Sequence, residues 1–148
     1  MMNTLVKYVC LPALIFLQAC TTNGPEPIHY GSDACAHCKM TIMDDKFGTE
    51  LVTSKGKVFK FDSIECMLDF IKDAPSVYLD AGNQVFVTDM LQPGSFIDAR
   101  QAIYVHDETL QSPMGGNLAA FRTRLLAQRS RTGSGVKFYS WDELLKAM

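Results

Sequence analysis

Two short segments in the first half of the chain show a strand-like pattern of apolar and polar residues. The segments cover residues 48–53 and 57–61 and flank the turn sequence Ser54-Lys55-Gly56. In the second segment, Phe59 and Phe61 are two positions apart and therefore project from the same face of an extended strand. Two such segments around a short turn that contains glycine predict a β-hairpin.

The apolar spacing changes to that of a helix directly after this hairpin. Apolar residues recur at intervals that place them on one helix face: Ile64, Met67, Leu68 and Ile71. We expect Asp62 to cap this helix, with Glu65 completing a capping box three residues later, and Pro75 to end it. Short strands are predicted beyond the helix, at residues 77–79 and 84–88.

The second half of the chain repeats this order of elements. Strands are predicted at residues 101–106 and 136–139, with a helix at residues 118–129 between them that Asn117 would cap. The sequence Ser140-Trp141-Asp142-Glu143 forms another capping box and predicts a terminal helix. The predicted fold class is therefore α+β: two similar ββαβ units with mostly antiparallel sheet, followed by a C-terminal helix.

The start of the chain resembles an export signal. A basic start that contains Lys7 precedes an apolar stretch at residues 8–16, which is too short to span a bilayer as a helix. The stretch ends in Leu17-Gln18-Ala19-Cys20. This ending resembles the lipobox of bacterial lipoproteins, in which the cysteine receives a lipid and the peptide bond before it is cut. An ordinary signal peptide and a buried N-terminal helix are the alternatives.

A lipid anchor at Cys20 defines the expected organisation of the chain. Residues 1–19 would be the signal peptide, and residues 20–33, which lack apolar periodicity, a lipidated flexible tether. The first ββαβ unit would cover residues 34–92 and the second unit residues 93–148. We expect the mature protein at the periplasmic face of a bacterial membrane, and specifically at the outer membrane, because a lipid would tether it there.

Composition limits the partners and the chemistry. With 47 % hydrophobic and 20 % charged residues the chain suits a packed protein, and a net charge of -2 gives no reason to expect nucleic-acid binding. Processing would remove Cys10 and lipidate Cys20, which leaves three thiols. An odd number of thiols in an exported protein favours a reactive or metal-binding cysteine over a disulfide scaffold. The sequence contains no motif of a hydrolase or nucleotide-binding enzyme, so we do not expect an enzyme.

The segment Cys35-Ala36-His37-Cys38-Lys39-Met40 concentrates sulfur ligands in one loop. A c-type haem site is excluded because Lys39 stands where that motif needs a histidine. A zinc site usually takes a second cysteine or histidine pair at short spacing, which the sequence lacks. A thioredoxin-like pair lies in a βαβ unit, and no such unit surrounds this segment. The thioether of Met40 suits Cu(I) better than Zn²⁺. Two interpretations of this segment therefore stay open: Cu(I) binding, and a Cys35–Cys38 disulfide with Met40 packed in the core.

A further sulfur ligand lies in the segment Ser112-Pro113-Met114-Gly115-Gly116. Two consecutive glycines allow the backbone to approach a neighbouring segment closely. Met114 could therefore be presented to the first motif as another soft ligand. The alternative is that Met114 is a hydrophobic plug at the end of the helix predicted after it.

These motifs occur in the same order in the NosL family, which the chain resembles over nearly its whole mature length. The features that carry the resemblance are the lipobox Cys20, the Cys-x-x-Cys-x-Met motif, Phe59-Lys60-Phe61-Asp62 with Cys66 in the next helix, and Ser-Pro-Met-Gly-Gly followed by Leu118-Ala119-Ala120-Phe121. The resemblance implies a Cu(I)-binding lipoprotein that delivers copper for the copper–sulfide centre of nitrous oxide reductase. The implied partners are this reductase and its membrane ABC-type maturation complex. The implied fold is two similar ββαβ units.

The resemblance also implies the metal ligands. Cys38 and Met114 are the first two, Met40 is a third donor, and Cys35 completes the set. Cys66, in contrast, is predicted to be a small buried residue of the first helix. Two alternative functions stay open: an exported thiol–disulfide oxidoreductase, and a structural zinc-binding module, each built on Cys35 and Cys38.

Overall fold

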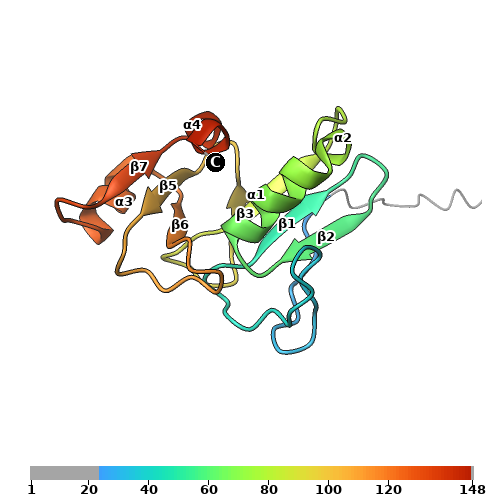
Figure 1. Ribbon diagram of the computed structural model, residues 1–148, viewed down its shortest axis with the longest axis horizontal. Coiled ribbons are helices and arrows are strands. Elements are labelled where there is room, and N and C mark those ends of the chain that lie inside the picture. Colours follow the sequence, from blue (N-terminus) through green and yellow to red (C-terminus); the bar gives the residue numbers. More distant parts are fainter. Residues whose placement is uncertain (1–23, 148) are drawn as a thin grey trace, which may run out of the picture.

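The computed structural model describes residues 24–147, so the predicted signal peptide and Cys20 lie outside the described residues. In chain order the elements are β1 (Thr49–Val52), β2 (Val58–Phe61), α1 (Ile64–Asp73), α2 (Pro75–Tyr78), β3 (Gln84–Thr88), β4 (Phe96–Asp98), β5 (Ile103–His106), β6 (Leu118–Phe121), α3 (Arg124–Ser130), β7 (Lys137–Tyr139) and α4 (Trp141–Ala147). The strands form two antiparallel sheets, in the orders β2-β1-β3-β4 and β6-β5-β7 (Figure 1). The predicted α+β class with a C-terminal helix is confirmed.

The first sheet is built on the predicted hairpin. β1 pairs with β2, with Leu51 opposite Phe59, and β3 pairs with the other edge of β1. β4 then pairs with β3, so this sheet extends beyond residue 92. The helix α1 lies across the sheet (Figure 1), and its predicted apolar stripe is buried: Ile64, Met67, Leu68 and Ile71. Burying this stripe against the strands supplies most of the driving force that holds α1 in place.

The start of α1 differs from its prediction. Ser63, and not Asp62, is the N-cap: its backbone is extended and its hydroxyl accepts a hydrogen bond from the backbone N–H of Cys66 at 3.2 Å. Asp62 instead accepts a hydrogen bond from the thiol of Cys38. Glu65 does not complete a capping box, because its carboxylate bonds to a distant loop. Both acidic side chains are thus available for tertiary contacts around the first turn of the helix.

The strand predicted at residues 77–79 is wrong. Helix α2 (Pro75–Tyr78) covers most of this segment, and its proline stands in the first turn. Proline cannot continue α1, but it is well tolerated at the beginning of a helix because the first N–H groups need no partner within the helix. The same residue therefore ends one helix and opens the next.

The helix predicted at residues 118–129 is wrong in its first part. Leu118–Phe121 form β6, which pairs with β5. All four residues of β6 are buried, so the segment lacks the polar alternation that would identify a strand. The helix α3 starts only at Arg124, and Thr123 replaces Asn117 as the cap by accepting a hydrogen bond from the N–H of Leu126.

The two sheets share the larger of two buried clusters, while the smaller one packs α3 against the second sheet. Leu118 of β6, and Trp141 and Leu144 of α4, belong to the same buried cluster as the apolar face of α1. The terminal helix itself has the predicted capping box, since the N–H of Ser140 donates to the carboxylate of Glu143 at 2.7 Å. The two halves therefore form one packed body.

The segment before the first motif is packed, contrary to the expected tether. Ile28 is buried, and the N–H of Glu26 donates to the carboxylate of Glu50 at 2.9 Å. The ammonium of Lys60 donates to the carbonyl of Pro27 and to the carboxylate of Asp33, both at 2.8 Å. The chain is thus attached to the first sheet before it reaches Cys35. Within residues 24–147, no helix is long and apolar enough to cross a membrane.

Candidate metal centre

A tight loop carries the Cys-x-x-Cys-x-Met motif. The N–H of Cys35 donates to the carbonyl of Met40 at 2.8 Å, and the N–H of Lys39 donates to the carbonyl of Cys35 at 3.1 Å. Lys39 has a φ of 69°, a left-handed conformation that reverses the chain direction. The N–H of Ala36 donates to the carbonyl of Lys60 in β2 at 2.7 Å, so the loop is fixed beside the end of that strand.

Three thiols and one carboxylate meet at this place. The Sγ atoms of Cys35, Cys38 and Cys66 and a carboxylate oxygen of Asp62 all lie within 4.8 Å of one another. Since Zn–S bonds are about 2.3 Å long, two sulfur ligands of one ion lie at most about 4.6 Å apart. Four tetrahedral ligands lie closer together, about 3.8 Å apart, so the cluster would contract around a bound ion. Its ligands come from the loop, from the residue after β2 and from the first turn of α1.

Burial makes the cluster accessible from one side only. The exposed fraction is 1 % for both Cys35 and Cys66, whereas Cys38 is half-buried. Burial raises the pKa of the Cys38 thiol, and it raises the pKa of the Cys66 thiol strongly, with the neighbouring Asp62 carboxylate adding to the effect. Without a metal, both thiols therefore hold their protons at neutral pH.

The carboxylate of Asp62 supports a cation site. Asp62 is buried, and its Oδ2 accepts the hydrogen bond from the thiol of Cys38 at 3.5 Å. Its Oδ1 is also buried and finds no hydrogen-bond partner within residues 24–147. A buried, unpartnered carboxylate oxygen costs free energy, and a cation among the thiols would compensate that cost.

Comparison with known proteins identifies the family. A sequence model of the NosL family matches residues 28–148. The chain belongs to the NosL family. The crystal structure of the copper chaperone NosL from Shewanella denitrificans is similar to it, with 27 % sequence identity and a TM-score of 0.71. The similarity covers 85 % of this chain and 98 % of that chain. No curated protein matches the chain.

This NosL-family chain exposes both methionines of its two motifs. The exposed fraction is 59 % for Met40 and 45 % for Met114. The alternative that places Met40 in the core is therefore wrong. Met114 is not a plug at a helix end either, because a strand and not a helix follows its loop. Both thioethers are accessible to an ion or to another protein, and their ligation of a metal stays a prediction.

The prediction for Cys66 was incomplete. Cys66 is buried, as expected, but its sulfur belongs to the thiol cluster of this NosL-family chain. Cys35, Cys38 and Cys66 are all free, so the predicted alternative of a Cys35–Cys38 disulfide is not formed among the described residues. His37 points elsewhere, with its Nδ1 3.7 Å from the carboxylate of Asp73. Two sequence signals could have included Cys66: the odd thiol count, and its place after Asp62 among the features of the NosL resemblance.

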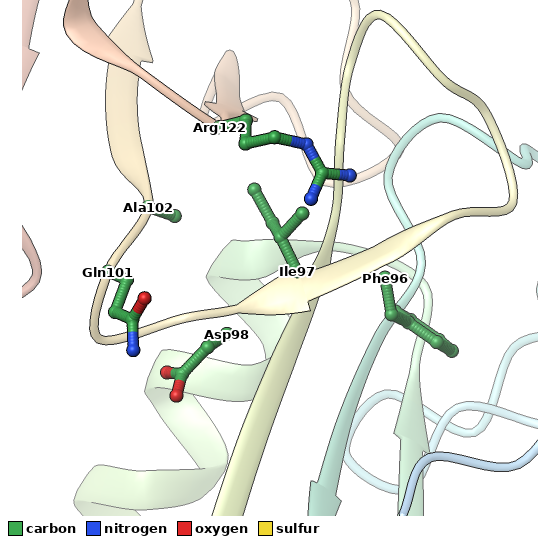
Figure 2. A pocket seen from close by; sticks show the side chains of 6 residues that line it. All are labelled: Phe96, Ile97, Asp98, Gln101, Ala102 and Arg122. Atoms are coloured by element: carbon green, nitrogen blue, oxygen red, sulfur yellow. The ribbon is translucent and has the colours of Figure 1, made fainter.

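A pocket of about 250 Å³ lies apart from the cluster, where β4 leads into β5 (Figure 2). Arg122 and Asp98 are the charged side chains that line it. The Nε of Arg122 is already paired with the carboxylate of Asp89 at 3.3 Å. Among the described residues that line this pocket there is no sulfur or imidazole ligand, in contrast to the thiol cluster.

Proposed function

We propose that this chain is a periplasmic copper chaperone that binds Cu(I) at the thiol cluster. It would deliver the ion for assembly of the copper–sulfide centre of nitrous oxide reductase. The observation that carries the proposal is the convergence of three thiols and one carboxylate, of which the thiol of Cys38 is only half-buried. Thiolates are soft ligands and favour Cu(I). Membership of the NosL family and the likeness to a copper chaperone support the same function.

The half-buried Cys38 gives the bound ion a route out of the protein. Cys35 and Cys66 are enclosed, so an acceptor protein would approach the ion from the side of Cys38. Met40 lies two residues from Cys38 with its thioether exposed, and Met114 is exposed as well. Thioethers are neutral, soft donors that would help to hold Cu(I) and yield to a thiolate of the acceptor.

We further propose that Cys20 carries a lipid and holds the protein at the periplasmic face of the outer membrane. The support is the signal-like sequence and its lipobox ending. The reductase and its membrane ABC-type maturation complex would be the partners. The packed segment from Glu26 to Asp33 leaves a short connection between the anchor and the folded protein.

A structural zinc site is the second candidate, because the donor set itself favours it. Three sulfur atoms and one carboxylate oxygen match the four ligands of tetrahedral Zn²⁺. Structural zinc sites are usually enclosed by their four protein ligands, whereas here Cys38 is half-buried. Co²⁺ addition under reducing conditions tests this second candidate. A zinc module gives an intense thiolate charge-transfer band with Co²⁺, and the absence of this band would contradict it.

The geometry does not favour a thiol–disulfide oxidoreductase. Such enzymes attack with a thiolate, and their reactive cysteine has a lowered pKa. Here burial raises the pKa of both Cys38 and Cys66. We therefore expect no reduction of insulin disulfides by the protein with intact thiols.

Competition for Cu(I) against a chromophoric chelator under anaerobic, reducing conditions tests the proposed function. We expect wild-type protein to withdraw Cu(I) from the chelator, and Cys38→Ala to bind it more weakly by at least about tenfold. Met43→Ala is the matched control, because Met43 is an exposed methionine close to the same loop that we do not assign to the site. A Cys38→Ala protein that holds Cu(I) as tightly as wild type would contradict the proposal.

A further inference from the structure

Two consecutive residues in the first turn of α1 face the two sulfur motifs. Cys66 contributes its thiol to the cluster with Cys35 and Cys38. Glu65 extends to the other motif: its Oε1 accepts hydrogen bonds from the hydroxyl of Ser112 at 2.7 Å and from the N–H of Leu118 at 3.3 Å. One helical turn therefore joins the thiol cluster to the loop that carries Met114.

The loop at residues 112–118 is shaped around this carboxylate. The hydroxyl that donates to Glu65 also accepts a hydrogen bond from the N–H of Asn117 at 2.9 Å, which closes the loop on itself. Gly115 and Asn117 have φ values of 72° and 53°, so the backbone turns through the left-handed region on both sides of Gly116. A Cβ on Gly116 would lie 2.5 Å from Oε1 of Glu65. The missing side chain at Gly116 thus makes room for the glutamate.

Burial makes this attachment costly to lose. Glu65 is only 6 % exposed, and its Oε2 is buried without a hydrogen-bond partner within residues 24–147. Glu65 lines a small pocket of about 160 Å³ between the two halves together with Gly116 and His106. Burying a carboxylate costs free energy, and the hydrogen bonds that Glu65 accepts from the loop offset this cost. The side chain of Glu65 therefore holds the loop against the helix more than packing of the exposed Met114 does.

We propose that Glu65 is a positioning residue that holds the loop at residues 112–118 against α1, so that the thioether of Met114 can join the thiols around Cu(I). The inference rests on the proposed function and adds a determinant of metal specificity. A thioether contributes to the binding of Cu(I) and hardly to that of Zn²⁺. Glu65 thus favours Cu(I) over Zn²⁺ without touching the ion.

A double-mutant cycle tests this role. Glu65→Ala and Met114→Leu should each lower the Cu(I) affinity by about tenfold, because removing a group that orients a metal ligand commonly costs 10–100-fold. The double variant should bind no more weakly than either single variant, since both changes remove the same thioether. Zn²⁺ affinity should stay the same in all three. Glu65→Gln keeps an acceptor oxygen and should retain most of the Cu(I) affinity.

Gly116→Ala provides a second variant if Glu65→Ala does not fold. It displaces the side chain of Glu65 from the loop while the glutamate remains in the chain, and it should give the same selective loss of Cu(I) affinity. Asp69→Ala is the matched control on the same helix, because Asp69 is half-exposed and pairs only with Lys72 among the described residues. This variant should bind both metals as wild type does.

The outcomes separate the two proposals. Wild-type protein that binds no Cu(I) overturns the proposed function and the positioning role together. If Cu(I) binds but the effects of Glu65→Ala and Met114→Leu add up, only the positioning role is wrong. An equal loss of Cu(I) and Zn²⁺ in Glu65→Ala and in Gly116→Ala would also overturn it, because that result would make Glu65 a support of the whole cluster.

Discussion

The protonation of Cys38 and Cys66 controls when the thiol cluster can bind a metal. Burial raises the pKa of both thiols, and the carboxylate of Asp62 adds to the effect at Cys66. The thiolate is the form that binds metal, so each cysteine that ligates must first lose its proton. Binding and proton release are therefore coupled at this site.

The first prediction follows from this coupling. At pH values below the raised pKa values, the metal-free thiols are protonated and must release protons to bind the ion. The apparent Cu(I) affinity should therefore rise with pH. The rise should be up to about tenfold per pH unit for each proton released. Chelator competition between about pH 6 and about pH 8 measures this slope. An affinity independent of pH would contradict thiolate ligation by Cys38 and Cys66.

The contact of Cys66 and Asp62 with the other two thiols does not follow from spacing or periodicity, although both residues are among the features of the NosL resemblance. Cys35 and Cys38 belong to one short motif, so their proximity follows from their spacing. Cys66 and Asp62 join them only because the loop attaches to β2 through the N–H of Ala36. This contact is tertiary, and neither hydrophobic periodicity nor capping rules contain information about it. Capping rules predict Asp62 at the helix cap, whereas its partner is the thiol of Cys38.

At the scale of the elements, the N-cap of α1 supports the cluster as well as the helix. The hydroxyl of Ser63 accepts from the N–H of Cys66, which orients the residue that carries the third thiol. The cap of α3 has the same geometry, with Thr123 accepting from the N–H of Leu126, but it lies away from the cysteines. The two caps therefore form a matched pair for experiment.

We predict that the two caps differ in their effect on metal binding. Ser63→Ala and Thr123→Ala should each destabilise the fold by about 1 kcal/mol, the usual cost of losing a cap. Only Ser63→Ala should also lower the Cu(I) affinity. Urea unfolding and chelator competition measure the two effects. Equal Cu(I) affinities in both variants would show that the cap does not orient Cys66.

Two elements could be predicted from local patterns. The turn with Gly56 and the pair Phe59 and Phe61 indicate the hairpin of β1 and β2, and the apolar stripe indicates α1; both are confirmed. The strand β6 was predicted as a helix because all four of its residues are buried, and a continuous apolar run has no period. The type of such a segment is decided by its pairing with β5, which is a long-range contact.

At the scale of the whole molecule, the two halves are joined through α4. The indole N–H of Trp141 donates to the hydroxyl of Tyr78 in α2 at 2.9 Å, and its ring packs near that of Tyr104 in β5. Trp141 therefore connects the helical layer of the first sheet with the second sheet. Because the larger buried cluster is shared in this way, neither half buries all of its apolar surface alone, although a smaller cluster lies within the second half.

This arrangement predicts that the protein unfolds in one cooperative step. Trp141 is the single tryptophan of the chain, so its fluorescence reports on the C-terminal half. The reactivity of the buried Cys66 reports on the first half. Both signals should change at the same urea concentration, as two-state unfolding requires. Two separate transitions would show that the halves are independent domains.

Copper-edge X-ray absorption of the Cu(I)-loaded protein tests the central claim most directly. The claim is that the cysteines of the cluster, Cys66 included, hold the ion. We predict a Cu(I) edge and a first shell of sulfur atoms in wild-type protein, with one sulfur fewer in Cys66→Ala. A first shell made mainly of nitrogen or oxygen, or one unchanged in Cys66→Ala, would contradict the claim.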